Sequence, residues 1–245
     1  MARIFITGSA DGLGHLAAKQ LVNQGHKVVL HARNEKRGKE ALARVPGAES
    51  VVTSDLSNIE ETKQLAAEVD RIGGFDAIIH NAGVYRATGE EIVAVNTLAP
   101  YILTCLIEPP NRLIYLSSQN QVYGRANLDN LANNHNDISY SDSKLHDLMF
   151  AKAVARLWPN VYANAVDPGW VPTKMGGTGA TDNLTKGYQT QAWLATSNDP
   201  GAKLSGHYFY HQKISQHNSA ADDISKQDKL LRICEQLTGV RLPVG

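Results

Sequence analysis

The sequence of 245 residues is poor in cysteine and has no excess of charge of either sign. Its two cysteines, Cys105 and Cys234, are too few and too far apart to suggest a disulfide framework or a zinc site. Lys and Arg together number 24, as do Asp and Glu, whereas proteins that bind nucleic acid in bulk usually carry a basic excess. His207 and His211 are four residues apart, and along a strand such a spacing is too wide to chelate one ion. We therefore expect neither a metal site nor a nucleic-acid partner.

Long hydrophobic runs are missing as well. No stretch of about 18 apolar residues occurs, and the chain passes from Met1 to Arg3 without the apolar core and cleavage site of a signal peptide. We therefore expect a cytoplasmic protein that does not associate with membranes. Hydrophobic residues make up 42% of the chain and charged residues 20%, which is typical of a globular protein, and the length suits a single domain over residues 1–245.

The pattern along the chain predicts a doubly wound α/β fold. Short apolar runs alternate with longer segments of helical period, as in a parallel sheet whose crossover helices cover both faces. The seven expected strands are Arg3–Thr7, Lys27–His31, Ser50–Ser54, Asp76–His80, Arg112–Leu116, Val161–Val166 and His207–Tyr210. Helices are expected at Leu13–Gln24, Ile59–Ile72 and Ser139–Leu157. The Gly/Thr-rich segment Gly176–Lys186 is expected to be a loop, within a substrate lid at about residues 170–200.

Three glycines stand where the first expected strand meets the first expected helix, in the segment Thr7-Gly8-Ser9-Ala10-Asp11-Gly12-Leu13-Gly14. Gly8 allows a tight turn, Gly12 lets a pyrophosphate approach the backbone, and Gly14 permits close packing of helix on strand. A Gly-rich turn alone is also compatible with an ordinary strand–helix connection. The spacing T-G-x-x-x-G-x-G resembles the fingerprint of the short-chain dehydrogenase/reductase family, and this resemblance implies a single-domain Rossmann fold.

The end of the second expected strand bears on the choice of cofactor. A dinucleotide fold that prefers NAD places an acid there to hold the ribose 2′-hydroxyl. Here Ala32 stands at that position and Arg33 follows it, and a guanidinium can pair with a 2′-phosphate. We therefore expect NADP(H) to be preferred over NAD(H); the alternative is that Arg33 is a solvated loop residue.

A tyrosine and a lysine one helical turn apart form the candidate catalytic pair. Tyr140 and Lys144 are at i and i+4 of an expected helix and so share one face. A free tyrosine titrates near pH 10, so it exchanges protons poorly at neutral pH unless a nearby cation stabilises its phenolate. Lys144 can supply that charge, which makes Tyr140 a candidate general acid and base, although an exposed Tyr–Lys pair is common on helices.

Other segments extend the resemblance to the family. Ser118, the second serine after the fifth expected strand, resembles the catalytic serine, with Ser117 as the alternative, and Asn96 resembles the asparagine that holds a water next to the lysine. The segment from Gly124 to Asp129 lengthens the Ser118–Tyr140 spacing to 22 positions and resembles an insertion of the retinol-dehydrogenase-like and carbonyl-reductase-like branch. The resemblance covers essentially the whole chain and implies a catalytic tetrad of Asn96, Ser118, Tyr140 and Lys144.

The resemblance also implies the residues that hold the cofactor. They are Gly8, Ser9, Asp11, Gly12, Leu13, Gly14, Arg33, Asp55, Leu56, Asn81, Ala82, Gly83, Tyr140, Lys144, Pro168, Gly169, Val171 and Thr173.

The implied activity is NADP(H)-dependent interconversion of a carbonyl and an alcohol by hydride transfer, in the direction of reducing a small or medium aldehyde or ketone. One alternative is a regulator that senses NADP(H) without turnover. Another is a sugar-nucleotide epimerase or dehydratase, which usually has a larger substrate domain and a different glycine spacing. Pro109 and Pro110 end early the helix that the family often uses for dimerisation, so a homodimer or a homotetramer is possible but not decided by the sequence.

Overall fold

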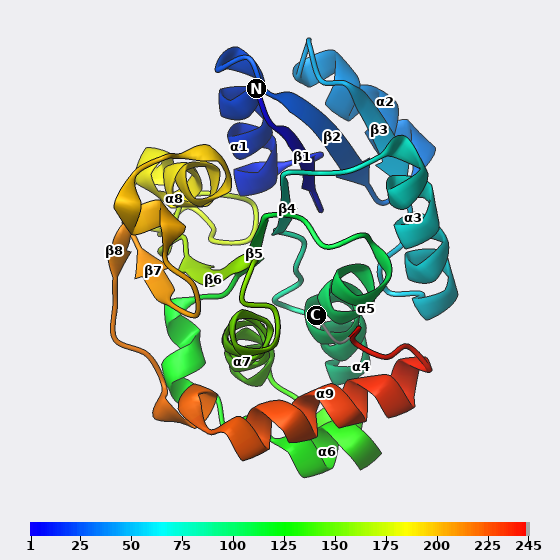
Figure 1. The fold of residues 1–245 in the computed structure, drawn as a ribbon, viewed down its shortest axis with the longest axis vertical. Helices are drawn as coiled ribbons and strands as arrows, with labels where there is room; N and C mark the ends of the chain where they lie inside the picture. Colours follow the sequence, from blue (N-terminus) through cyan, green and yellow to red (C-terminus); the bar gives the residue numbers. More distant parts are fainter. Residues whose placement is uncertain (244–245) are drawn as a thin grey trace.

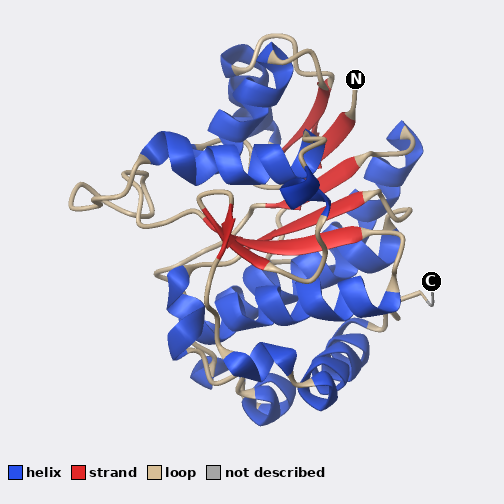
Figure 2. Cartoon of the chain, turned by 60° about the vertical axis from the view of Figure 1, so that its left-hand side comes forward, coloured by secondary structure: helices blue, strands red, loops and turns tan. Residues whose placement is uncertain are grey.

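The protein is described here from a computed structural model that covers residues 1–243, and it is built on one eight-stranded sheet (Figures 1 and 2). The strand order is β3-β2-β1-β4-β5-β6-β7-β8, with β1 to β7 parallel and β8 antiparallel to β7. The strands are β1 (Arg3–Ile6), β2 (Lys27–Ala32), β3 (Ser50–Thr53), β4 (Ala77–His80), β5 (Arg112–Leu116), β6 (Tyr162–Asp167), β7 (Tyr208–Tyr210) and β8 (Lys213–Ile214). All seven predicted parallel strands are confirmed.

The eighth strand was not predicted, because its two residues are exposed at the sheet edge and carry no pattern. His211 and Gln212 link it to β7 with φ angles of +47° and +63°. Such left-handed pairs form the tight turns of β-hairpins.

The central parallel strands are buried on both faces, which explains the continuous apolar runs of the sequence. In β1, for example, Ile4 and Ile6 contribute to one hydrophobic core and Phe5 to the other. Helices α1, α2 and α8 cover the first core, and α3, α5 and α7 cover the second, so the sheet lies between two helical layers (Figure 2). The predicted doubly wound arrangement is confirmed.

The helices are α1 (Gly12–Asn23), α2 (Glu35–Arg44), α3 (Ile59–Ile72), α4 (Gly89–Ile92), α5 (Ala99–Leu106), α6 (Leu128–Asn133), α7 (Tyr140–Leu157), α8 (Leu184–Thr196) and α9 (Ile224–Thr238). The helices expected from the sequence correspond to α1, α3 and α7. The start of α7 is fixed by a capping box, in which Ser139 accepts a hydrogen bond from the Asp142 N–H and the Asp142 carboxylate accepts one from the Ser139 N–H. This cap sets the first turn of the helix that carries Tyr140.

A further layer lies outside α5 and α7. Helix α9 contacts α7 and α6, and in Figure 1 it crosses the molecule beside both. Beyond α9, the Val240 carbonyl accepts a hydrogen bond of 2.8 Å from the Tyr101 hydroxyl of α5. The C-terminal segment therefore covers the outer side of these helices.

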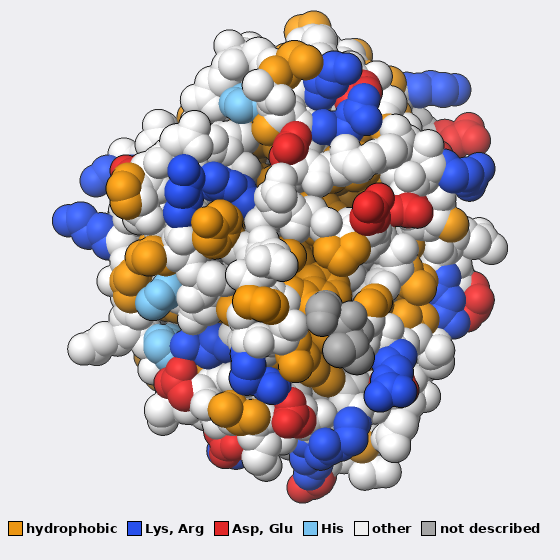
Figure 3. Space-filling model, viewed as in Figure 1, with side chains coloured by type: hydrophobic (Ala, Val, Ile, Leu, Met, Phe, Trp, Pro, Cys, Tyr) orange, Lys and Arg blue, Asp and Glu red, His pale blue; other side chains and the backbone are white. Residues whose placement is uncertain are grey.

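Side chains of both charges are interspersed on the face shown in Figure 3, in keeping with the net charge of zero. Within residues 1–243, no helix is both long enough and apolar enough to cross a lipid bilayer.

Candidate active site

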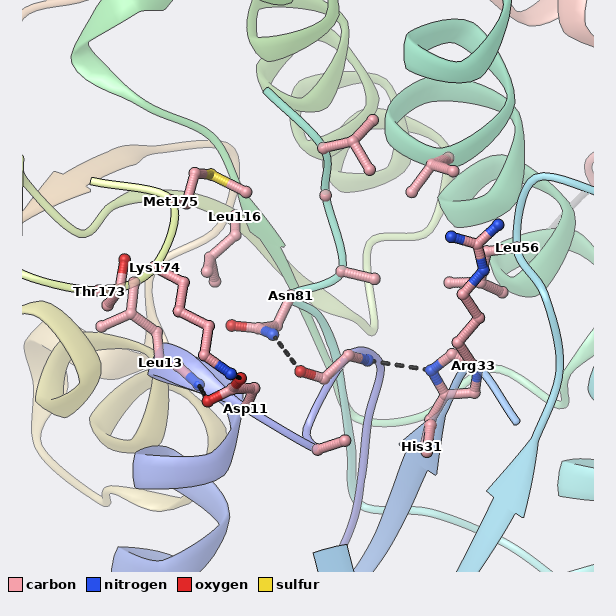
Figure 4. Close-up of a pocket in the computed structure, with 18 of the residues that line it drawn as sticks. Asp11, Leu13, His31, Arg33, Leu56, Asn81, Leu116, Thr173, Lys174 and Met175 are labelled. Carbon is pink, nitrogen blue, oxygen red and sulfur yellow. Dashed lines mark hydrogen bonds and ion pairs between the residues drawn. The ribbon is translucent and has the colours of Figure 1, made fainter. Parts of the chain in front are cut away.

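A cavity of about 370 Å³ opens at the carboxyl ends of the parallel strands (Figure 4). Its walls come from the turn after β1, the ends of β2, β3, β4 and β5, helix α7 and the loop after β6. Open α/β sheets bind ligands at this edge, where the strand order reverses. Most of the residues predicted to hold a cofactor line it: Gly8, Asp11, Gly12, Leu13, Arg33, Asp55, Leu56, Asn81, Ala82, Gly83, Tyr140, Lys144, Pro168 and Thr173.

The glycine turn needs its glycines for conformation and for space. Gly8 and Gly12 have φ angles of +63° and +56°, which side chains with a Cβ rarely adopt. A Cβ on Gly14 would lie 2.4 Å from the Asn81 amide nitrogen, so Gly14 is required for close approach to the turn after β4. Gly14 and Ser9 lie behind the cavity wall: the Ser9 hydroxyl donates to the Ile6 carbonyl at 2.9 Å.

His31, at the end of β2, holds the glycine turn and was not found by sequence reasoning. Its Nδ1 accepts a hydrogen bond of 3.0 Å from the Gly8 N–H, so its proton must be on Nε2, which lies 3.1 Å from the Ser54 carbonyl. The ring is buried, and burial lowers its pKa to about 4. A neutral histidine therefore connects the ends of β1, β2 and β3.

Two arginines and two carboxylates stand at the end of the cavity next to β2 and β3. Arg33, which is 58% exposed, forms an ion pair of 2.8 Å with Asp55. Arg37 lies 3.7 Å from Asp11 and also lines the cavity, although it was not predicted. Its position four residues after Arg33, in the first turn of α2, is the sequence signal that could have found it.

The loop after β6 closes against the glycine turn. Lys174 forms an ion pair with Asp11, which caps the start of α1 through the Gly12 N–H (Figure 4). This contact, together with the backbone, lowers the pKa of Asp11 against the effect of burial. Lys174 is a further cation at the cavity that sequence reasoning missed.

Tyr140 and Lys144 lie on one face of α7, with the Lys144 Nζ 5.6 Å from the centre of the Tyr140 ring. The two serines after β5 point to different partners. The Ser117 hydroxyl donates to the Lys144 carbonyl at 2.6 Å, whereas Ser118 shares the wall of a cavity with Tyr140 and lowers the pKa of the phenol. The Ser118 oxygen accepts from the Asn120 N–H at 3.2 Å, which leaves its proton free for another partner. This geometry favours Ser118 over Ser117 as the serine that faces the reacting oxygen.

Lys144 has a buried carboxylate partner, Asp147, which sequence reasoning missed although it lies at i+3 on the same helix. The Lys144 Nζ donates to Asp147 at 2.8 Å and to the Leu116 carbonyl at 2.7 Å, and the two side chains are only 6% and 4% exposed. Burial lowers the pKa of Lys144, but the charge and hydrogen bond of Asp147 and the charge of Tyr140 together outweigh it, so the net shift is upward. Burial raises the pKa of Asp147 to about 6 despite the nearby lysine.

Burial and several neighbouring side chains shift the pKa of the Tyr140 phenol. Burial raises its pKa, Lys144 and Ser118 lower it, and Asp147 and Asp167 raise it, so that the net direction is upward. The expected lowering by Lys144 is therefore present, but the carboxylate beside the lysine and the burial of the ring outweigh it.

Asn96 sits in a π-helical turn, Val93–Leu98, directly before α5. Its side chain bonds both backbone groups of Val84, at 2.8 Å and 2.9 Å, and donates to the Ser143 hydroxyl at 3.0 Å. A Cβ on Gly83 would lie 3.4 Å from the Asn96 Oδ1 and 3.5 Å from the Lys144 Nζ. Asn96 therefore fixes the chain after β4 beside Lys144.

A second cavity, of about 470 Å³, shares Tyr140 with the first and holds Ser118, Gly169 and Val171 in its wall. The Val171 carbonyl accepts a hydrogen bond of 2.8 Å from the Thr173 N–H, and Thr173 lines both cavities. Of the lid expected at about residues 170–200, the part over the cavities is the loop before residue 184. Helix α8 instead packs into the hydrophobic core.

Across residues 1–243, His, Cys, Asp and Glu side chains form no group of three that could hold a metal ion.

Replacement of His31 by glutamine should change how stability depends on pH. As the pH falls, the histidine is protonated near pH 6.5 in the unfolded chain but only near pH 4 in the folded protein. Protonation between these two values therefore favours the unfolded chain, and stability is lost as the pH falls through this range. We expect the free energy of unfolding of the wild type to fall, relative to that of His31→Gln, by about 2 kcal/mol between about pH 6.5 and pH 5. Urea unfolding at several pH values measures the difference, and parallel curves would contradict the role of His31.

Comparison with known proteins agrees with this geometry. The family model for short chain dehydrogenase matches residues 2–183. An uncharacterized oxidoreductase of Emericella nidulans is 46% identical over 258 residues, which cover 100% of both chains. Retinol dehydrogenase 14 of Homo sapiens is 28% identical, over 97% of this chain and 86% of its own.

Solved structures share the fold. A protein from Mycobacterium paratuberculosis superposes with a TM-score of 0.83 at 24% identity, over 99% of this chain and 95% of that one. A short chain dehydrogenase of Shigella flexneri, complexed with NADP, gives a TM-score of 0.68 at 22% identity, over 86% of this chain and 97% of that one. The chain belongs to the short-chain dehydrogenase/reductase family of oxidoreductases.

Proposed function

We propose that the protein is an NADP(H)-dependent oxidoreductase that interconverts a carbonyl and an alcohol and works as a reductase of an aldehyde or ketone. The observation that carries this proposal is the position of Tyr140, which lines both cavities, with Lys144 and Ser118 beside it. One cavity can hold the cofactor and the other the substrate, with a proton donor where they meet.

The first cavity fits a nicotinamide dinucleotide. Its glycine turn leaves room that a Cβ would fill, and backbone N–H groups at the start of α1 attract phosphate. When bound, the nicotinamide supplies or accepts the hydride. Lys144, Asn81 and Gly83 would lie along its ribose end, and Pro168, Gly169, Val171 and Thr173 beside the carboxamide.

In the direction of reduction, the Tyr140 hydroxyl donates its proton to the carbonyl oxygen of the substrate as the hydride arrives at the carbon. Ser118 has a free O–H that can donate to the same oxygen and hold it in place. The raised pKa of Tyr140 keeps the phenol protonated, which suits a general acid. Lys144 stabilises the phenolate that remains, and Asn96 fixes the backbone beside it.

The preference for NADP(H) rests on the cations at the adenosine end. Arg33 and Arg37 line the cavity there and are 58% and 46% exposed, so either can turn toward a 2′-phosphate. The ion pair of Arg33 with Asp55 is partly solvated and can be exchanged for a phosphate, whose two charges attract a guanidinium more strongly. The Shigella flexneri structure, which holds NADP, supports a cofactor of this type for the fold.

The first prediction from this function concerns Tyr140→Phe. Removing the proton donor should reduce kcat for carbonyl reduction by about 10²- to 10⁴-fold, because general acid catalysis contributes that much. NADPH oxidation with a panel of aldehydes and ketones measures turnover, and fluorescence titration measures NADPH binding, which should change far less. If the wild-type protein binds NADPH but none of the carbonyls supports NADPH oxidation, the alternative of an NADP(H) sensor would be favoured.

The second prediction concerns Arg33→Ala. Loss of a charged hydrogen bond to the 2′-phosphate should weaken NADPH binding, relative to NADH binding, by about 10- to 100-fold. Fluorescence titration with both cofactors measures the ratio. Arg71→Ala is the control, because Arg71 lies at the C-terminal end of α3 and lines neither cavity. Equal affinity of the wild type for NADPH and NADH would show that Arg33 does not select the cofactor.

The third prediction concerns Asp147→Asn. Without this carboxylate, one of the charges that raise the pKa of Tyr140 is removed, while Lys144 keeps the Leu116 carbonyl as an acceptor and stays charged. The pKa of Tyr140 should therefore fall, while Asp167 and Ser118 still act on it. Because reduction needs the protonated phenol, the alkaline limb of the pH–rate profile should move to lower pH. Asp228→Asn, which breaks a surface ion pair with Arg156, is the control. A lower kcat with an unshifted profile would mean that Asp147 has only a structural role.

A further inference from the structure

Three large apolar side chains remain exposed around the second cavity. Tyr85, Trp170 and Met175 line it and are 44%, 56% and 48% exposed. Tyr85 comes from the segment after β4, and the other two come from the loop after β6. Apolar side chains that gather around one concave surface are typical of a site for an apolar ligand.

The two aromatic rings are held in place. The Trp170 indole N–H donates to the Gly176 carbonyl at 2.8 Å, and its backbone N–H donates to the Asp182 carboxylate at 2.7 Å. With its polar atom satisfied inside the protein, the indole can offer an apolar face to a ligand. The Tyr85 ring meets the Tyr140 ring edge-on, with 4.9 Å between their centres. A substrate whose carbonyl reaches Tyr140 would therefore place its remaining atoms beside an aromatic wall.

Arg86 gives this cavity its charge. It is the one lysine or arginine among the lining residues, it is exposed, and within residues 1–243 it forms no ion pair with a carboxylate. The acidic lining residue, Asp167, is buried and accepts a hydrogen bond of 2.8 Å from the Gly169 N–H, and burial raises its pKa. The available charge that the cavity presents to a ligand is thus positive.

We infer that the substrate is an aromatic aldehyde or ketone that carries a carboxylate, with its ring against Tyr85 and Trp170 and its carboxylate on Arg86. A guanidinium can bind a carboxylate with two parallel hydrogen bonds. A cavity of about 470 Å³ is large enough for one substituted ring. This inference rests on the proposed carbonyl reduction and assigns the substrate class to the same site.

The test compares acids with neutral amides of nearly the same shape. NADPH oxidation is measured with 3- and 4-acetylbenzoate and with 3- and 4-acetylbenzamide. For at least one ring position, we expect kcat/KM of the wild type for the acid to exceed that for the amide by about tenfold or more, chiefly through a lower KM. Added salt should reduce this ratio, because it screens an exposed ion pair.

Variants of Arg86 test whether this residue causes the preference for the acid over the amide. Arg86→Gln should bring the ratio of acid to amide close to one, and Arg86→Lys should keep part of the preference. Arg125→Gln is the matched control, because Arg125 is also an exposed arginine but lies outside both cavities, and it should keep the wild-type ratio.

The outcomes separate this inference from the function on which it rests. Equal use of acid and amide, a preference that survives in Arg86→Gln, or reduction of aliphatic carbonyls alone would overturn the substrate class and leave carbonyl reduction intact. Failure to oxidise NADPH with any carbonyl would instead overturn the proposed function and, with it, the substrate class.

Discussion

The ammonium group of Lys144 must stay charged in the interior, and the arrangement of the site follows from that requirement. An isolated buried cation would lose its proton or destabilise the fold, so it needs a carboxylate and further acceptors close by. Asp147 supplies the carboxylate from the next helical turn, and the Leu116 carbonyl supplies an acceptor from the end of β5. The bond to Leu116, together with the bond from the Ser117 hydroxyl to the Lys144 carbonyl, fixes α7 against the end of β5 and so sets the position of Tyr140 relative to Ser118. Lys144 thus supplies the charge near the Tyr140 phenol and also helps to set the position of the phenol.

The walls of the first cavity are held by hydrogen bonds between neighbouring strand ends. The Thr7 hydroxyl accepts from the N–H groups of Asn81 and Ala82, at 3.0 Å each, and so connects the turns after β1 and β4. His31 connects the turn after β1 to the end of β3. These contacts are wholly or partly buried, so they are less affected by salt than surface ion pairs, and they fix the backbone that a dinucleotide would approach. The ion pairs at the rim, by contrast, are exposed and can exchange partners.

The second cavity is formed by different parts of the chain. Most of its wall comes from loops after β4, β5 and β6, and loops vary without disturbing the sheet. Tyr140 lies on a helix that packs on the sheet, whereas Tyr85, Arg86 and Trp170 lie on loops. Under the proposed function, substrate specificity would therefore be separable from proton transfer.

The sequence by itself determined the features that depend on neighbours along the chain. The seven parallel strands, the glycine turn and the shared helix face of Tyr140 and Lys144 follow from short-range patterns, because backbone geometry fixes which residues of one element lie together. Only the tertiary structure decided which of two adjacent serines faces the phenol, that Asp147 is buried beside Lys144, and that Arg33 pairs with Asp55 and is joined at the cavity by Arg37. It also placed residues 184–196 in a core helix. Each of these depends on packing between elements far apart in the sequence, where burial decides whether a polar side chain meets water, a charge or a ligand.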